Sequence, residues 1–147
     1  MFDLFTDRAR KVVAYSNLEA QRLCHEIIDT EHVLLAFVKE GHGEGAYSLR
    51  KLRVKLRTVQ AEVDKLVPSG PPRSWLGKPR RAHTARVQRV YEYAIEESRT
   101  LHHNSVGTGH ILIGLIRERD GVAGQVLRNL GLTPELVREE VFKVAKI

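Results

Sequence analysis

The chain has 147 residues, of which 42% are hydrophobic, 29% charged and 6% aromatic, which favours one folded domain over a disordered chain or a large multidomain protein. Cys24 is the only cysteine, so an intramolecular disulfide and a cysteine-rich zinc site are excluded, and we expect a reducing, cytoplasmic setting. The formal net charge of +6 does not by itself indicate nucleic-acid binding, because Arg73, Lys78, Arg80 and Arg81 lie in one stretch without an acidic residue.

Four helices are predicted in the first half of the chain. Thr6 is a suitable N-cap for the first, in which apolar residues recur at helical spacing up to Leu23. Thr30 is expected to cap the second, which ends near the glycines at 41–45, and two shorter helices follow within residues 46–66. No alternating pattern predicts a strand. The first residues carry acids where a secretory signal needs bases, and no apolar run approaches the roughly 20 residues of a membrane span, so we expect neither secretion nor a membrane partner.

The second half of the chain repeats the first. A shift of 78 residues aligns residues 6–63 with 84–141 without a gap, so that His32 matches His110, for example. The second set of four helices is therefore expected to have caps at Thr84 and Thr108. One difference concerns the end of the third helix. In the second copy Gly131 can adopt the left-handed conformation that commonly ends a helix, but the first copy has Arg53 at the matching position. The end of this helix in the first copy must therefore change or be strained.

The segment between the two copies is predicted to be a linker. Residues 67–82 contain four of the five prolines, which can continue neither a helix nor a β-ladder. We expect an all-α fold of eight helices in two tandem, pseudo-symmetric four-helix repeats, residues 1–66 and 83–147. The repeats should dock to form one domain over residues 1–147, because each alone is too small to bury a full core.

Several motifs resemble one known family. They are the segments at residues 2–13, 30–35, 43–46, 106–118 and 121–131. They resemble the double-repeat N-terminal domain of the Clp unfoldases, and the ClpC branch most. The resemblance implies a non-catalytic module that recruits substrates or adaptors to an ATP-driven unfoldase coupled to a protease, either as part of such an unfoldase or as a stand-alone relative. The chain contains no Gly-x-x-x-x-Gly-Lys-Ser/Thr phosphate loop, so we expect neither ATP hydrolysis nor a cofactor.

The resemblance implies a ligand site at Thr30, Glu31 and His32. In the ClpC branch each repeat has Gly-Thr-Glu-His here, and the glutamates hold the guanidinium of phosphorylated arginine. In this chain Asp29 replaces the glycine of the first copy, and Gly109 replaces the glutamate of the second. We therefore expect at most one weak site, perturbed by the charge of Asp29. The alternative is that Glu31 only complements the helix dipole.

A second candidate surface consists of Phe2, Phe5, Arg10 and Lys11. In related domains the N-terminal segment with its phenylalanine helps to bind adaptors and certain cyclic peptides, so the resemblance implies a partner-binding patch here. The alternative for Phe5 is a core position ahead of the Thr6 cap.

Histidine pairs recur in both copies, His25 with His32 and His103 with His110. Two imidazoles near a helix junction could ligate zinc, but a site needs a third or fourth ligand, so we expect no metal. Hydrogen bonds that fix the loop before the second helix are the favoured interpretation.

Two rival functions have weaker motifs. Ser48 and Lys51 fit a Ser-x-x-Lys pattern, which would indicate a small hydrolase, but the accompanying motifs are missing. A nucleic-acid-binding protein would use the basic residues from Arg50 to Arg57 and the linker at 73–81, although such proteins usually present a broad face of one sign.

Overall fold

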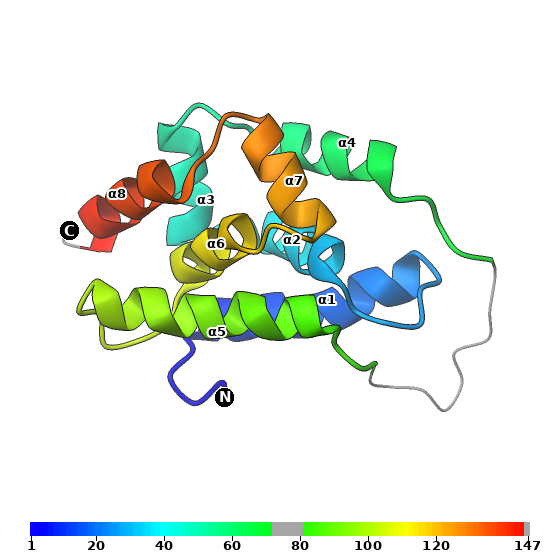
Figure 1. The fold of residues 1–147 in the computed structure, drawn as a ribbon, viewed down its shortest axis with the longest axis horizontal. Coiled ribbons are helices and arrows are strands. Elements are labelled where there is room, and N and C mark those ends of the chain that lie inside the picture. The colour runs from blue at the N-terminus through cyan, green and yellow to red at the C-terminus, as the bar shows by residue number, and fades with distance from the viewer. Residues whose placement is uncertain (72–80, 146–147) are drawn as a thin grey trace.

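A computed structural model describes residues 1–71 and 81–145, and within these residues the predicted all-α fold of eight helices is confirmed (Figure 1). The helices are α1 (Asp7–Arg22), α2 (Thr30–Glu40), α3 (Glu44–Lys51), α4 (Leu56–Leu66), α5 (Ala85–Thr100), α6 (Thr108–Arg117), α7 (Val122–Asn129) and α8 (Pro134–Ala145). The linker is expected to begin after α4, but residues 72–80 lie outside the described residues, so the division at 67–82 stays a prediction.

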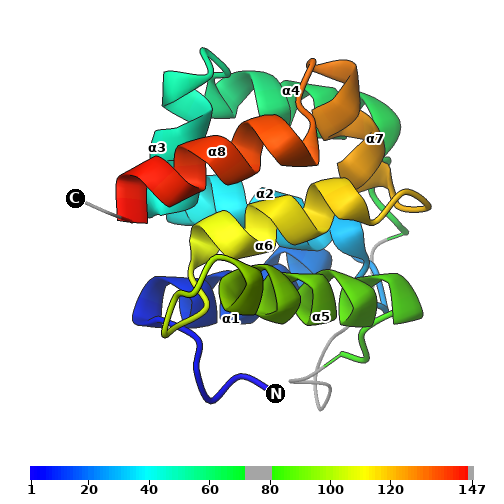
Figure 2. The same cartoon turned by 60° about the vertical axis from the view of Figure 1, so that its left-hand side comes forward.

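The helices lie in three layers (Figure 2). α1 and α5 form one outer layer, α2 and α6 the middle, and the remaining four helices the other outer layer. The middle helices are apolar on nearly all sides: residues 33–37 of α2 and 111–116 of α6 are all buried. A helix that is hydrophobic all round is stable only when it is covered on every side, which explains why these two lie at the centre.

The third helix of each repeat packs against the other repeat. α3 of the first repeat packs against α6 and α8, and α7 of the second packs against α2 and α4 as well as against α6 of its own repeat. The chain before each repeat is also paired with the other repeat: Phe5 bridges to Val106, and His83 bridges to Ile28. The predicted docking is therefore an interleaving, in which each repeat completes the core of the other.

The expectation that Thr30 and Thr108 are N-caps is wrong. Asp29 and Gly107 occupy the caps, and each threonine is the first helical residue with its side chain buried. The Thr108 hydroxyl accepts a hydrogen bond from the N–H of Gly45 at 3.0 Å, and the Thr30 hydroxyl accepts one from Ala123 at 3.3 Å. The threonines thus satisfy the free amides at the start of α3 and α7 in the opposite repeat.

Of the two alternatives for the end of the third helix, a changed end or a strained one, the structure shows the strained one. Gly131 after α7 has a φ of 87°, and Arg53 after α3 has a φ of 63°. The backbone keeps the same left-handed turn in both repeats, so Arg53 bears a strain that Gly131 avoids.

Candidate functional site

The first candidate site is a surface pocket at the N-terminus of α2. Its volume is about 480 Å³, and its lining includes Asp29, Glu31, His32 and, from α5, Arg86. Thr30 does not line it, because its side chain points into the interface with α7. The structure therefore brings Glu31 and His32 together as expected, but leaves Thr30 only its backbone, whose N–H donates to the Asp29 carboxylate at 2.8 Å.

Arg86 was not found by sequence reasoning. Its guanidinium donates to both carboxylate oxygens of Asp29, at 3.1 Å and 2.6 Å, and the Thr84 hydroxyl donates to the same carboxylate at 3.1 Å. Partial burial raises the pKa of Asp29, but the bonds from Arg86 and Thr30 outweigh it and lower the pKa. Asp29 is thus a charged cap that is ion-paired with Arg86, and its charge still acts on the pocket by raising the pKa of Glu31, in the direction that the expected perturbation requires.

Glu31 is one of three acidic residues that line the pocket, with Glu26 and Asp29. Burial raises the pKa of its carboxyl, its own backbone N–H lowers it and the nearby Asp29 charge raises it again, so that the net direction is upward. With the guanidinium of Arg86 on the same wall, the pocket offers an acceptor for a cationic group and a donor for an anionic one.

The histidine pairs form hydrogen-bonded relays, as favoured from the sequence. The N–H of Asp29 donates to His32 Nδ1 at 2.9 Å, so a neutral His32 carries its proton on Nε2, which lies 2.7 Å from His25 Nδ1. His25 Nε2 in turn reaches the Pro68 carbonyl at 3.0 Å. The second copy repeats this arrangement, with 2.7 Å between His103 and His110.

Burial, and then the neighbouring histidine, lower the pKa of both His32 and His110 to about 4. Both residues therefore stay neutral at ordinary pH. No group of three or more possible metal-ligating side chains occurs within residues 1–71 and 81–145.

At the second copy of this site a pocket of about 430 Å³ is lined by His103, His110 and a side chain from the first repeat, Glu44. Gly109 replaces the acid in the sequence, but the Glu44 carboxylate accepts a hydrogen bond from the N–H of Gly109, and burial is the main reason that the pKa of Glu44 is raised. A Cβ on Gly109 would lie 2.8 Å from Val141 Cγ2 and 3.1 Å from Glu44 Cγ. Close packing therefore requires the glycine, and the acid comes from another helix.

The second candidate site is a groove between α1 and the segment at residues 81–83. Its volume is about 510 Å³, and it is lined by Phe2, Arg10, Val13, Ala14, Asn17, Ile28, Arg81 and His83. Phe2 is half-buried, Phe5 lies in the core at 4% exposure, and Lys11 is exposed outside the groove. The structure thus brings Phe2 and Arg10 together and places Phe5 beneath them.

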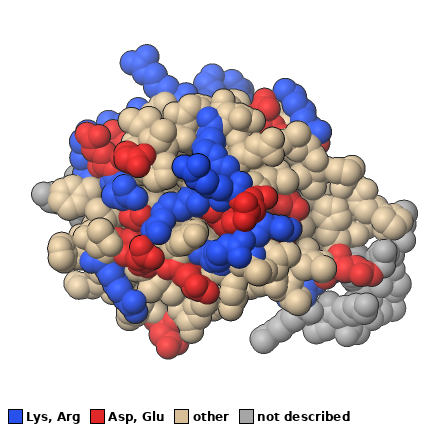
Figure 3. All heavy atoms as spheres, viewed as in Figure 1, with Lys and Arg blue, Asp and Glu red and all other residues tan. Residues whose placement is uncertain are grey.

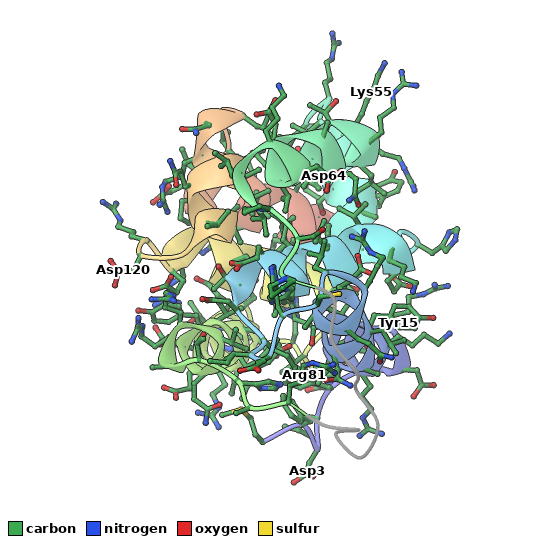
Figure 4. The ribbon with its side chains drawn as sticks, turned by 90° about the vertical axis from the view of Figure 1, so that its right-hand side faces the viewer. Asp3, Tyr15, Lys55, Asp64, Arg81 and Asp120 are labelled. Carbon is green, nitrogen blue, oxygen red and sulfur yellow. The ribbon has the colours of Figure 1, made fainter. Side chains whose placement is uncertain are left out.

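Tyr91 and Arg81, which sequence reasoning missed, stabilise the walls of this groove. The buried Tyr91 ring meets the edge of Phe2 at a centroid distance of 5.2 Å and an angle of 89°. Arg81, labelled in Figure 4, donates to the Asn17 side chain at 3.1 Å and to the His25 carbonyl at 3.0 Å, which links the groove to the histidine relay.

The hydrolase motif is not assembled as a catalytic pair. The side chain of Ser48 is buried and its hydroxyl donates to the Glu44 carbonyl at 2.8 Å, whereas the Lys51 ammonium lies over the Tyr47 ring.

Across the described ranges, no helix has the length and apolar character needed to span a membrane.

Sequence comparison identifies close relatives of the chain. The model of the Clp repeat (R) N-terminal domain family matches residues 4–129 and 82–146. The chain is 43% identical over 97% of its length to a probable ATP-dependent Clp protease ATP-binding subunit of Chlamydia pneumoniae, and 43% identical over 98% to ClpC/MecB of Bacillus subtilis, a negative regulator of genetic competence. It spans 17% of the length of each of these relatives.

Solved structures share the fold. The N-terminal domain of the caseinolytic-protease-associated chaperone ClpD from Arabidopsis thaliana matches with a TM-score of 0.75 and 25% identity, covering 100% of this chain and 97% of that one. The Hsp104 N-terminal domain from Candida albicans matches with a TM-score of 0.76 at 15% identity, covering 96% and 91%, which shows the fold alone.

Proposed function

The chain belongs to the Clp repeat N-terminal domain family, and we propose that it is a non-catalytic module that recruits substrate or adaptor proteins to a Clp-type ATP-dependent unfoldase. The names of its relatives support this proposal, since they include an ATP-binding subunit of the Clp protease. The absence of a phosphate-loop motif from the sequence agrees with a binding role.

The observation that carries the proposal is the groove at Phe2. An aromatic side chain that is half-exposed, seated on the buried rings of Phe5 and Tyr91, and flanked by Arg10 has the chemistry of an interface anchor. Arg10 donates to the Asp3 carbonyl at 3.1 Å, which ties the N-terminal segment to α1. An anchor held in this way loses little conformational entropy when a partner binds.

A pull-down tests this role. The immobilised chain is incubated with a lysate of its source cells, and bound Clp ATP-binding subunits and their adaptors are quantified by mass spectrometry. Phe2→Ala should reduce this capture severalfold, whereas Leu136→Ala, which truncates a side chain on α8 that is 42% exposed, should leave it unchanged. No enrichment of Clp components with the wild-type chain, or equal loss in both variants, would refute the proposed function.

We also propose that the pocket at the N-terminus of α2 binds one phosphorylated arginine weakly. Glu31 would hold the guanidinium, and the exposed part of Arg86 would face the phosphoryl group. The matching place in the second repeat is unsuited to an anion, because the Glu44 carboxylate already accepts from the N–H of Gly109.

Calorimetric titration with free phosphoarginine tests the pocket. We expect at most one site per chain, which Glu31→Gln weakens at least tenfold, and which the control Glu139→Gln on α8 leaves intact. Two equivalent sites, or affinity unchanged by Glu31→Gln, would contradict the assignment. This result is independent of the pull-down, because the two sites use different residues.

A further inference from the structure

The turn between α3 and α4 gathers positive charge on one corner of the molecule. Five basic residues occur within eight positions, all five are exposed, and we call them the basic corner: Arg50, Lys51, Arg53, Lys55 and Arg57. The apolar residues between them are half-buried against the core.

The basic corner is not neutralised by the protein itself. Among residues 1–71 and 81–145, no ion pair joins any of its five side chains to a carboxylate, whereas the arginines of α5, α6 and α8 take part in several. Arg50 donates only to the Gly41 carbonyl, at 2.9 Å, and the Lys51 ammonium lies 5.6 Å from the centre of the Tyr47 ring.

The second repeat provides an internal control for this corner. At the positions that match Arg53, Lys55 and Arg57 it has Gly131, Thr133 and Glu135. Thr133 accepts a hydrogen bond from the N–H of Leu136 at 3.2 Å, which is a normal N-cap, and Glu135 lies in the first turn of α8, where the dipole favours an acid.

The first repeat departs from each of these favourable choices. Arg53 takes a left-handed conformation with a φ of 63°, the N-cap Lys55 makes no side-chain hydrogen bond, and Arg57 puts a cation in a first turn that has no acid. Each departure costs local stability, and all three replace a neutral or acidic residue by a basic one. Residues that reduce local stability are retained where they serve a function. A function that depends on positive charge therefore explains these three basic residues.

The basic corner lies away from both candidate sites. Lys55 projects at one end of the molecule in Figure 4, and Arg81 and Asp3 lie toward the other end. On the face seen in Figure 3, acidic and basic side chains are interspersed over α5, while Lys and Arg project from the upper edge, where α3 and α4 lie.

We propose that the basic corner docks an acidic segment of a partner polypeptide. Charge complementarity favours carboxylates, because five clustered cations have no acid of their own. Nucleic acid is less suited, because the aromatic residue of α3, Tyr47, already has the Lys51 ammonium over its ring, at 5.6 Å from the centroid. The mixed charges of the neighbouring face also leave no broad positive track for a phosphate backbone.

Fluorescence anisotropy with a labelled octaglutamate peptide tests this proposal. The triple variant Arg53→Gly, Lys55→Thr, Arg57→Glu imports the residues of the second repeat and should weaken binding at least about tenfold, with the wild-type affinity falling as salt rises. The control triple Arg99→Ser, Arg119→Glu, Lys143→Ser removes the same charge from exposed positions elsewhere and should change the affinity less than about twofold.

The urea midpoint of each variant is measured alongside binding. The corner triple should be at least as stable as the wild type, so that lost binding cannot be assigned to unfolding, and the milder pair Lys55→Gln, Arg57→Gln should weaken binding in the same direction. No binding of octaglutamate by the wild type, equal loss in both triples, or tighter binding of a labelled octathymidylate at the same salt would overturn the proposal.

Discussion

His32 and His110 are the residues at which acid should act first. Each accepts a backbone N–H at Nδ1, so neither nitrogen can take a further proton without breaking a hydrogen bond. Their pKa is about 4 in the folded protein, against 6.5 for an ordinary histidine. A lowered folded-state pKa means that the stabilising contribution is complete above pH 6.5 and is lost as pH falls toward 4.

The free energy of unfolding should therefore fall by on the order of 1–2 kcal/mol per histidine between about pH 7.5 and 5, as measured by urea titration. His110→Gln removes one titrating group, so it should reduce this pH dependence by the share of one histidine. Any loss of stability that it causes at neutral pH is measured separately, because that loss does not vary with pH. The exposed His42→Gln is the control and should leave the slope unchanged. A pH-independent unfolding free energy in the wild type would contradict the relay.

At the scale of elements, the N-terminus of α2 packs against that of α7, and the N-terminus of α6 packs against that of α3. A Cβ on Gly43 would lie 2.3 Å from the Thr108 hydroxyl oxygen, and a Cβ on Gly121 would lie 2.3 Å from that of Thr30. The glycines therefore allow a helix of one repeat to approach the helix start of the other closely enough for the threonine to cap it. This contact between a glycine and a threonine therefore occurs twice, and in each case the threonine comes from the opposite repeat.

Replacing Thr108 by Val keeps the side-chain volume but leaves the buried N–H of Gly45 without its acceptor. We expect a loss of about 1–2 kcal/mol in the free energy of unfolding, because the desolvated donor is no longer paired. Chemical denaturation measures this loss, and Thr58→Val on the exposed side of α4 should change stability by less than about 0.5 kcal/mol. Equal effects of the two substitutions would show that the contact across the repeats contributes nothing.

At the scale of the whole molecule, the packing of α3 and α7 against the opposite repeat makes the two repeats one cooperative unit. The apolar face of α3 is covered by α6 and α8, and α4 is covered in part by α7. A separated first repeat would expose the residues that these helices bury, including Leu49 and Val59. Each half would keep the packing of α1 on α2 or of α5 on α6, but it would lose the cover that the other repeat gives to its remaining helices.

Residues 1–71 and 81–147 produced as separate chains should therefore be unfolded alone and should fold when mixed. Circular dichroism detects the gain of helix, and size-exclusion chromatography detects a one-to-one complex. The unbroken chain should show a single unfolding transition. Two halves that each unfold cooperatively on their own would contradict the interleaved architecture.

The sequence by itself determined the features that depend on local pattern. The helical periodicity and the repeat offset predicted eight helices, hydrogen bonds of His32 and His110 in the loop before the second helix, the core position considered for Phe5 and a changed or strained turn at Arg53. These predictions succeed because hydrophobic period, capping chemistry and left-handed turns involve residues close together along the chain.

Only the tertiary structure decided which repeat each partner came from. Arg86 neutralises Asp29 across 57 positions of the chain, and Glu44 reaches Gly109 from the opposite repeat. The threonines that the sequence assigns to their own helix starts serve the other repeat instead. Such contacts depend on how the repeats interleave, and an internal duplication leaves this undetermined, because each helix has two equivalent positions against which it could pack.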